Sequence, residues 1–259
     1  MDLGIRGKKA IVCASSRGLG KGCAEALAEA GCDLVVNGRD ADVLARTAEE
    51  IRDRFGVEVI EVSGDVADPA IQKKLVAALP QVDILVNNNG GPPYRPFKEL
   101  DREAILKGVT NNMVAPLELI QAVMEGMAER GFGRIVNITS LSVYMPIPGL
   151  DLSSGARAGL TSFLAGVART VADKNVTINQ ILPGKLDTDR LRGPHEPGSV
   201  EDPAAAAKRK AEQAANVPAK RLGTPAEFGK VCAFLCSEHA GYLTGQNIRV
   251  DGGLYVSAF

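Results

Sequence analysis

The chain has 259 residues, of which 45% are hydrophobic, enough for the buried core of one large α/β domain. Thirty Lys and Arg residues balance 31 Asp and Glu residues, so a net charge of −1 gives no global field that would favour nucleic acid or an anionic membrane. No apolar run is long enough to span a bilayer, and the first residues lack the apolar region of a signal peptide. We therefore expect a cytoplasmic protein that binds neither nucleic acid nor membrane.

The five cysteines form no C-x-x-C pair, and the two histidines, His195 and His239, lie in unrelated contexts. This pattern predicts neither a metal site nor a disulfide framework. We interpret the thiols as small buried side chains. They are Cys13, Cys23, Cys32, Cys232 and Cys236.

Strand-like and helix-like segments alternate along the chain. Strands are expected at 10–12, 33–37, 58–63, 83–87, 134–139, 177–182 and 247–250. Helices are expected at 21–30, 41–55, 69–79, 102–130, 153–172 and 225–236, with Pro116 bending the long one. This alternation predicts an α/β fold with a single doubly wound parallel sheet, the Rossmann fold, and helices on both faces. No break in composition divides residues 1–259, so we expect one domain.

The stretch Ile11–Gly20, IVCASSRGLG, joins the first strand to the first helix through a glycine-rich turn. The N-terminus of a helix presents unpaired N–H groups, and glycines let a phosphate approach the backbone. Gly18 and Gly20 are followed by Cys23 where a strict dinucleotide pattern has a third glycine. The turn alone is therefore a weak indication of a nucleotide site.

Small, polar and glycine residues follow most of the predicted strands. In a parallel sheet, ligands bind at the carboxyl ends of the strands, where the strand order reverses. We therefore group the segments that follow the strands as one expected cleft: 14–20, 37–39, 65–66, 88–91, Ser140 and 183–188.

Over nearly its whole length the chain resembles the short-chain dehydrogenase/reductase family, and most closely its 3-oxoacyl-acyl-carrier-protein reductases. The matching blocks, in chain order, are ASSRGLG in the first turn, GDV at 64–66, NNNG at 87–90, Asn112, VNITS ending at Ser140, PGKLDT at 183–188 and FLCSEHAGYLTGQNIRVDGG near the end. The resemblance implies an oxidoreductase that transfers hydride between a nicotinamide cofactor and a carbonyl or alcohol substrate.

The resemblance also implies which residues bind the cofactor. The phosphates would contact Ser15, Ser16, Arg17, Gly18, Leu19 and Gly20. The adenine would contact Asp65 and Val66, and the ribose Asn88, Asn89, Gly90 and Arg157. The nicotinamide end would contact Pro183, Gly184, Leu186 and Thr188.

Two departures from the family pattern lie in this cofactor set. Cys13 and Ala14 stand where relatives usually have Thr-Gly, and Ala14 fits if its φ angle is negative. Asn89 replaces the alanine of NNAG and brings a bulkier polar group near the ribose. We expect both to be compatible with binding.

The corner after the second strand bears on the choice of cofactor. A carboxylate there accepts a hydrogen bond from the ribose 2′-OH of NAD, whereas arginine binds the 2′-phosphate of NADP. Asn37 and Arg39 follow Val36, and Arg17 lies in the glycine turn. Asp40 is the counter-candidate, but its position before a helix is typical of an N-cap. We expect NADP(H) to be preferred over NAD(H).

The catalytic block departs from the family at two positions. The resemblance implies a Ser at Ser140, a Tyr thirteen residues later and a Lys four residues after that, with Asn112 completing the site. This chain has Ser153 for the Tyr and Arg157 for the Lys, within SSGARAGL. Positions i and i+4 share a helix face, so a cation there would lower the pKa of a phenol. Serine is a far weaker acid, and arginine does not release a proton at working pH.

Two interpretations stay open. In one, a hydroxyl protonates the substrate while Arg157 and Asn112 order the cofactor and water, and the candidate groups are Ser140, Ser153, Tyr144 and Tyr94. In the other, the protein binds nucleotide but is catalytically idle, as a sensor would be. General acid catalysis is worth about 10²- to 10⁴-fold, so its loss would slow turnover without abolishing cofactor binding.

Several further expectations concern the periphery of the site. Tyr144 is expected to serve in packing, and Asp151 and Ser154 in capping a helix. The polar segment 187–220 falls where relatives have a lid over a small-molecule substrate. Pro194, Pro197, Gly198 and Pro203 favour a loop there, followed by a helix at 204–215. Its cations (Lys208, Arg209 and Lys210) are interpreted as a solvated face. The resemblance also implies a homotetramer built on the long helix and the Ser153 helix.

Overall fold

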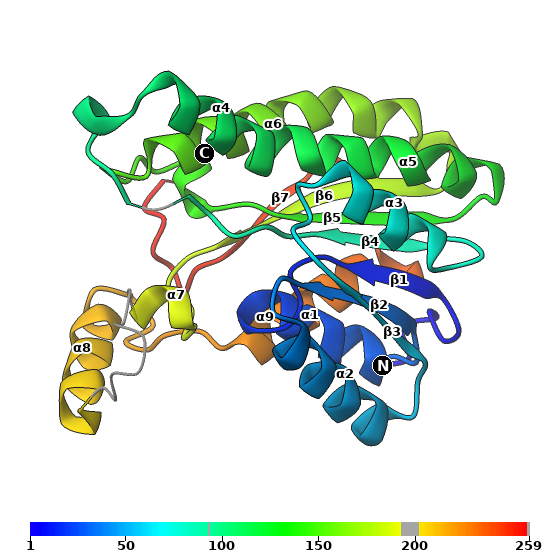
Figure 1. Ribbon diagram of the computed structural model, residues 1–259, viewed down its shortest axis with the longest axis horizontal. Helices are drawn as coiled ribbons and strands as arrows, with labels where there is room; N and C mark the ends of the chain where they lie inside the picture. Colours follow the sequence, from blue (N-terminus) through cyan, green and yellow to red (C-terminus); the bar gives the residue numbers. More distant parts are fainter. Residues whose placement is uncertain (93, 193–201, 258–259) are drawn as a thin grey trace.

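The computed structural model describes residues 1–92, 94–192 and 202–257. Seven parallel strands form one sheet in the order β3-β2-β1-β4-β5-β6-β7 (Figure 1). The strands are β1 (Lys9–Val12), β2 (Asp33–Gly38), β3 (Val59–Ser63), β4 (Ile84–Asn87), β5 (Gly133–Ile138), β6 (Val176–Pro183) and β7 (Asn247–Val250). The predicted doubly wound parallel sheet is confirmed, and its strand order reverses between β1 and β4, where such sheets bind ligands.

Helices cover both faces of the sheet, because side chains alternate along the strands and both faces are apolar. One face packs Ala10 and Val12 of β1 against α1 (Gly18–Glu29), α2 (Ala41–Phe55) and α9 (Pro225–Leu235). The other packs Ile11 against α3 (Pro69–Ala77), α5 (Ala115–Glu129) and α6 (Asp151–Thr170). Short 3-10 turns are η1 (Phe97–Glu99), η3 (Leu141–Val143), η4 (Ala172–Lys174) and η5 (Glu238–Ala240).

Helices α1 and α9 touch backbone to backbone. A Cβ added at Gly229 would lie 2.0 Å from the carbonyl oxygen of Gly22. A Cβ added at Gly22 would lie 2.2 Å from the carbonyl oxygen of Pro225. The two glycines therefore fix how closely α9 supports the helix that follows the glycine turn.

The predicted long helix at 102–130 is interrupted. It consists of α4 (Arg102–Val109), a π-helical turn η2 (Thr110–Val114) and α5. The irregularity predicted at Pro116 therefore takes the form of a π-helical turn in the residues just before the proline. Pro116 has no N–H, so in an α-helical register it leaves the carbonyl of Asn112 without a donor, and in a π-helical register that of Asn111. The chain widens at this point, and Asn112 lies within the widened turn.

Two helix starts were predicted too late. Helix α1 begins at Gly18 rather than residue 21, because the last residues of the glycine turn already have helical geometry. Helix α6 begins at Asp151, and the predicted caps are wrong: the N-cap is Leu150, without a side-chain hydrogen bond. Ser154 instead donates its hydroxyl to the carbonyl of Leu150 at 3.0 Å.

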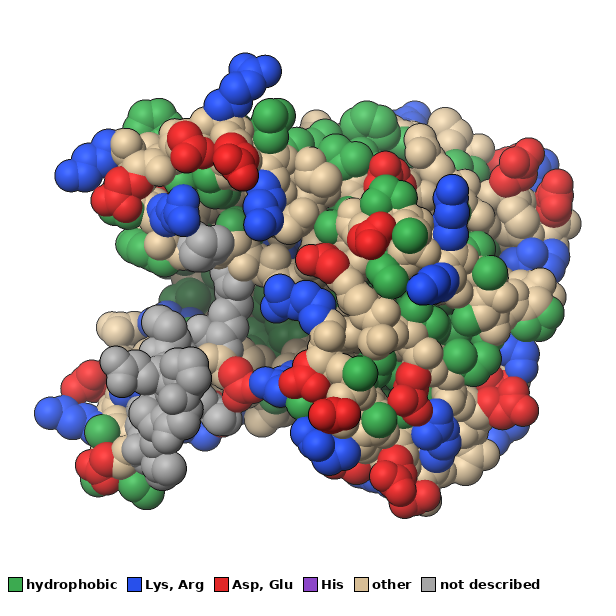
Figure 2. Space-filling model, in the orientation of Figure 1, with side chains coloured by type: hydrophobic (Ala, Val, Ile, Leu, Met, Phe, Trp, Pro, Cys, Tyr) green, Lys and Arg blue, Asp and Glu red, His purple; other side chains and the backbone are tan. Residues whose placement is uncertain are grey.

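The predicted lid at 187–220 contains α7 (Asp189–Arg192) and α8 (Pro203–Ala215), and α8 buries none of its residues. Pro194, Pro197 and Gly198 lie outside the described residues. Figure 2 shows the molecular surface hollowed between the lobe that carries α4 and the lobe that carries α8. Lys210 pairs with Asp187 at 2.5 Å, so part of the cationic face of α8 is used to hold the helix against the chain that leaves β6.

All five cysteines are buried and free, as expected for small core side chains. Burial raises the pKa of the Cys13 thiol to about 12. No helix in the described part of the chain combines the length and apolar character needed to cross a membrane.

Candidate active site

Asn37 holds the turn that follows β1. Its side-chain oxygen accepts a hydrogen bond from the N–H of Ala14 at 3.1 Å, and its amide donates to the carbonyls of Val62 and Gly64. Ala14 has a φ of +44°, contrary to the negative angle that we expected for a non-glycine residue. This left-handed conformation costs about 1–2 kcal/mol for alanine. Two hydrogen bonds offset this cost. Asn37 accepts from the N–H of Ala14, and Asn88 donates to the Ala14 carbonyl at 3.1 Å, so both peptide groups of Ala14 are held.

The rest of the turn is fixed through its own backbone. The Ser15 hydroxyl is fully buried, donates to the Val12 carbonyl at 2.7 Å and accepts from the N–H of Asn37. The carbonyl of Ser16 accepts from Thr47 of α2 at 2.9 Å. A Cβ at Gly20 would lie 2.2 Å from the Ala14 carbonyl oxygen, so the turn closes tightly there. Arg17 is the N-cap of α1 but makes no side-chain cap, so no side chain of the N-cap residue covers the first N–H groups of the helix.

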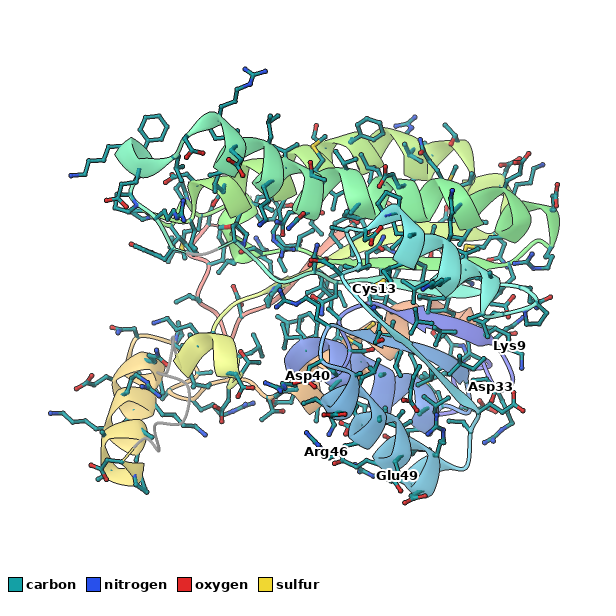
Figure 3. All side chains as sticks on the ribbon, in the orientation of Figure 1. Lys9, Cys13, Asp33, Asp40, Arg46 and Glu49 are labelled. Atoms are coloured by element: carbon teal, nitrogen blue, oxygen red, sulfur yellow. The ribbon has the colours of Figure 1, made fainter. Side chains whose placement is uncertain are left out.

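A basic corner lies beside this turn. The side chain of Arg17 is 59% exposed and lies 3.5 Å from the Asp40 carboxylate, and Arg39 is also exposed. Asp40 caps α2 by accepting from the N–H of Val43 at 3.1 Å, as predicted. Figure 3 shows Asp40 on the side of the sheet where β1 ends, opposite Lys9 and Asp33, which pair at 2.6 Å where β1 and β2 begin.

The remaining predicted cofactor residues lie along the same edge. Asp65 is exposed and accepts from the N–H of Ala67, whereas Val66 is buried. A Cβ at Gly18 would lie 3.7 Å from the Thr188 methyl, so the segment after β6 lies against the glycine turn. Leu186 is buried, and a Cβ at Gly184 would lie 2.7 Å from the Cα of Asp251. Pro183 ends β6 beside Val250 of β7.

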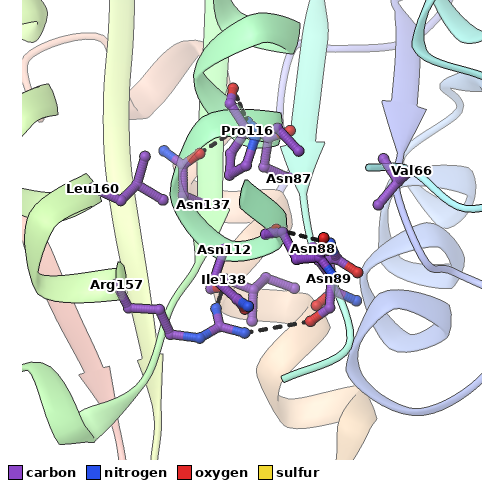
Figure 4. Close-up of a pocket in the computed structure, with 12 residues that line it drawn as sticks. Val66, Asn87, Asn88, Asn89, Asn112, Pro116, Asn137, Ile138, Arg157 and Leu160 are labelled. Carbon is purple, nitrogen blue, oxygen red and sulfur yellow. Dashed lines mark hydrogen bonds between the residues drawn. The ribbon is translucent and has the colours of Figure 1, made fainter. Parts of the chain in front are cut away.

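Ser153 and Arg157 form a buried pair on one face of α6. Ser153 is 4% exposed and Arg157 is 7% exposed. The Nε–H of Arg157 donates to Ser153 Oγ at 3.2 Å, and one terminal N–H group donates to the carbonyl of Ile138 at 2.5 Å. The other donates to the carbonyl of Asn89 at 3.3 Å, as Figure 4 shows. Three protein acceptors thus fix the plane of the guanidinium.

Asn89 links this pair to the widened helical turn. Its side-chain amide donates to the carbonyl of Asn111 at 2.8 Å, while its own carbonyl receives Arg157. The carbonyl of Asn111 is one of those that lack a helical donor because of Pro116. The larger residue at position 89 therefore supplies a hydrogen bond that alanine would not. Gly90, the next residue, is exposed, with open space where a Cβ would lie.

A cavity of about 20 Å³, room for about one water molecule, lies beside the Arg157 guanidinium. Asn112 lies in its wall, 3% exposed, and donates its amide to the Gly108 carbonyl at 3.2 Å. Within the described residues, no donor reaches Asn112 Oδ1. The other asparagines in the wall are Asn87, Asn88, Asn89, Asn111 and Asn137.

Sequence reasoning missed a row of buried amides across the sheet. Asn87 donates to Asn137 Oδ1 at 2.9 Å, and Asn137 donates to Gln180 at 3.5 Å. These residues lie side by side on β4, β5 and β6. The signal was present, because an amide within an otherwise apolar strand requires a partner. The row lies next to the cavity and fixes the strand ends that carry the site.

The candidate hydroxyls are not all brought together. Ser140 is half-buried at the end of β5, and its oxygen accepts from the N–H of Ser142 at 3.1 Å. The Tyr144 hydroxyl accepts from Asn247 at 2.7 Å, and its ring contacts Tyr255, which agrees with a packing role. Tyr94 is 66% exposed and packs on Gly149, where a Cβ would lie 2.5 Å from the ring. Ser153, by contrast, accepts a hydrogen bond from the Arg157 guanidinium.

The sheet is parallel, and a glycine-rich turn lies at the point where its strand order reverses. These two features place the chain in the class of Rossmann-fold α/β proteins. The model of a family described as enoyl-(acyl carrier protein) reductase matches residues 13–255. The 3-oxoacyl-acyl-carrier-protein reductase FabG of Aquifex aeolicus (strain VF5) is 32% identical over 262 residues, which cover 98% of this chain and 100% of that protein. The chain belongs to the short-chain dehydrogenase/reductase family, as its motifs predicted.

Solved structures agree with this placement. L-sorbose reductase from Gluconobacter frateurii, complexed with NADPH and L-sorbose, matches with a TM-score of 0.91 and 30% identity over 99% of this chain and 100% of that chain. A 3-oxoacyl (acyl-carrier-protein) reductase from Agrobacterium tumefaciens with NADP bound matches with a TM-score of 0.87 and 27% identity over 97% and 95%. Both of these similar proteins are reductases by name, which supports oxidoreductase chemistry for the fold.

Proposed function

We propose that this protein is an NADP(H)-dependent oxidoreductase that transfers hydride between nicotinamide and a small carbonyl or alcohol substrate. The observation that carries the proposal is the glycine turn at the switch point. It is held rigid by Asn37 and Asn88 and ends in a helix whose N-cap residue makes no side-chain cap. Such a turn binds a pyrophosphate through backbone N–H groups and the helix dipole.

The residues present fit the cofactor. Arg17 and Arg39 are exposed beside the turn, and the nearby carboxylate of Asp40 is engaged as a helix cap. Guanidinium groups bind a 2′-phosphate through charge-assisted hydrogen bonds, so this corner favours NADP(H) over NAD(H). Bound NADPH would supply the hydride that becomes the new C–H bond of the product. The NADPH and NADP seen in similar reductases support the same preference.

The substrate oxygen would meet hydroxyls rather than a phenol. Ser140 follows β5, and Ser153 lies in the first turn of α6. The adjoining cavity is lined by Asn112 and by Arg157, which contacts Ser153. Because no lysine or tyrosine stands at these two positions, the catalytic acid is atypical. The similar proteins reduce sugars and 3-oxoacyl groups by name, and we propose substrates of that kind: ketoses, 3-oxoacyl thioesters or simple ketones.

We also propose a homotetramer built on α5 and α6. The outer side of α6 exposes Phe163, whose exposed fraction is 53%, and η2 exposes Val114 at 38%. Large apolar side chains exposed on neighbouring elements are typical of a protein interface. Size-exclusion chromatography with light scattering measures the mass. A monomer would exclude this assembly without bearing on the activity.

The proposal is tested by two measurements. Fluorescence titration gives the dissociation constants of NADPH and NADH, and NADPH absorbance follows turnover of a panel of 3-oxoacyl thioesters, ketones and ketoses. We expect tighter binding of NADPH and measurable reduction of at least one panel member. Absence of binding to either nucleotide would refute the function, and tighter binding of NADH would refute the cofactor preference.

A second function rests on a specific observation. The Arg157 guanidinium donates to three protein acceptors, so it is less available to the cofactor ribose than a free lysine would be. This arrangement favours a nucleotide-binding sensor without turnover. Tight NADPH binding with no reduction across the panel would select it.

A further inference from the structure

We propose that Ser153 is a catalytic residue that acts as a fixed hydrogen-bond donor to the substrate oxygen, oriented by Arg157, in place of a titrating acid. The inference rests on the proposed reductase function and assigns the residue that stabilises its transition state. It follows from the direction of the hydrogen bonds around Ser153.

The Ser153 oxygen is already an acceptor. Arg157 Nε–H donates to it at 3.2 Å, so one lone pair is occupied by a cationic donor. A serine hydroxyl has one proton to donate. Within the described residues, that proton has no acceptor, whereas the neighbouring Ser154 donates its proton to the Leu150 carbonyl at 3.0 Å. The hydroxyl proton of Ser153 thus stays available for donation, whereas that of the adjacent Ser154 is already used.

Local geometry explains the difference between the two serines. A helical serine ordinarily donates to the carbonyl four residues earlier, which for Ser153 is Gly149. That carbonyl receives the N–H of Arg95 at 2.9 Å from the loop after β4. Ser153 is held by Arg157 on its other side, and the guanidinium is itself fixed by the carbonyls of Ile138 and Asn89. A preoriented donor of this kind needs no reorganisation when charge develops.

Ser140 repeats the arrangement on the neighbouring segment. Its oxygen accepts from the N–H of Ser142 at 3.1 Å, and within the described residues its proton also has no acceptor. The segment that follows it, η3, packs against α6. Two serines, one at the N-cap of η3 and one in the first turn of α6, therefore each have an N–H donor on the oxygen and a proton without an acceptor among the described residues.

Bound NADPH would supply a hydride with its two electrons, which would form the new C–H bond at the carbonyl carbon while the C=O π pair moves to oxygen. The negative charge on that oxygen would accept a hydrogen bond from the O–H of Ser153, and the oxygen would take its proton from water. The products would be the alcohol, hydroxide and the oxidised cofactor. Arg157 remains protonated throughout and stabilises the negative charge through the serine oxygen. Ser153 donates a hydrogen bond and retains its proton.

The experiment compares Ser153→Ala and Ser153→Thr with the matched control Ser154→Ala, on the substrate of the panel that is reduced fastest. Loss of one donor of this kind costs about 10²- to 10³-fold in kcat. We expect that loss for Ser153→Ala, substantial recovery with Ser153→Thr, and kcat within twofold of wild type for Ser154→Ala. The dissociation constant of NADPH should be unchanged in Ser153→Ala, because its hydroxyl acts on the substrate. The melting temperature should fall by a few degrees, because the buried Nε–H of Arg157 loses its acceptor.

The possible results distinguish a failure of the role proposed for Ser153 from a failure of the reductase function. If wild type reduces a panel member and Ser153→Ala matches Ser154→Ala in kcat, the role of Ser153 is wrong and the reductase function stands. A drop in kcat matched by an equal loss of NADPH affinity also overturns it, because Ser153 would then act only through the cofactor site. If wild type binds NADPH but reduces nothing, the reductase function fails, and the role of Ser153 with it.

Discussion

Replacing Gly229 by alanine tests whether the contact between α1 and α9 sets the geometry of the cofactor turn. The added methyl carbon would lie 2.0 Å from the carbonyl oxygen of Gly22 and 2.5 Å from its carbonyl carbon. Both neighbours are backbone atoms, so no side-chain rotation relieves the overlap. Real Cβ atoms essentially never approach another heavy atom more closely than 3.0 Å. The two helices must therefore separate by at least 1 Å to bring the distance between the added Cβ and the Gly22 oxygen to that limit.

The expected cost follows from that displacement. Overpacking a well-packed interface costs about 1–3 kcal/mol, which for a chain of this size lowers the melting temperature by roughly 2–12 °C. Helix α1 begins at the glycine turn, so its movement also displaces the N–H groups that we propose bind the cofactor phosphates. A misplacement of about 1 Å can cost up to about 10²-fold in a positioned site. We expect NADPH affinity to fall at least tenfold.

The matched control is Lys230→Ala, one residue further along α9. It removes the ion pair between Lys230 and Glu29, which joins the same two helices at the surface. An exposed pair contributes about 0–1 kcal/mol, so this variant should lose little stability and no NADPH affinity. Thermal unfolding and NADPH fluorescence titration measure both. If Gly229→Ala behaves like Lys230→Ala in the two assays, the backbone contact does not position the turn.

Three further predictions concern charge and burial. Arg39→Ala should weaken NADPH binding about tenfold and leave NADH binding unchanged, whereas Arg54→Ala at the far end of α2 should alter neither, as fluorescence titration measures. The Arg221 guanidinium lowers the pKa of Glu227 from 4.5 to about 2, so the stability from this carboxylate is lost as pH falls through that range. The melting temperature of Glu227→Gln should therefore decline less than that of wild type between pH 4.5 and 2. Because burial raises the pKa of Cys13 to about 12, iodoacetamide at about pH 8 should label that thiol only after unfolding, as mass spectrometry would show.

The topology was predictable because two physical signals agreed along the whole chain. Short apolar runs alternate with amphipathic segments, and each run ends in small or polar residues, so the strands had to be parallel and their ends had to meet. The Asp40 cap was predictable for a similar reason. A carboxylate just before a helical pattern is typical of an N-cap. The Asp40 side chain accepts a hydrogen bond from the N–H of Val43.

The inaccurate predictions concern positions where a distant residue decides the local conformation. Ala14 adopts a positive φ because Asn37 and Asn88, from two other strand ends, hold its peptide groups. Asn37 was assigned to the cofactor corner, yet it is 1% exposed and its side chain bonds three backbone groups. Whether it also touches a nucleotide stays a prediction. No local propensity carries this information, because the partners are distant in sequence.

The departures from the family pattern make sense as a unit. Asn89, Ser153 and Arg157 are distant in sequence, yet Arg157 contacts both of the others. Lysine has one ammonium group and lacks the planar fork that reaches Ser153, Ile138 and Asn89 at once. Serine at position 153 supplies a small acceptor at hydrogen-bonding distance from the Arg157 Nε–H. In the site that we propose, the contact between Arg157 and Ser153 orients the hydroxyl that stands in place of the family's tyrosine. A single exchange at either position would remove this contact.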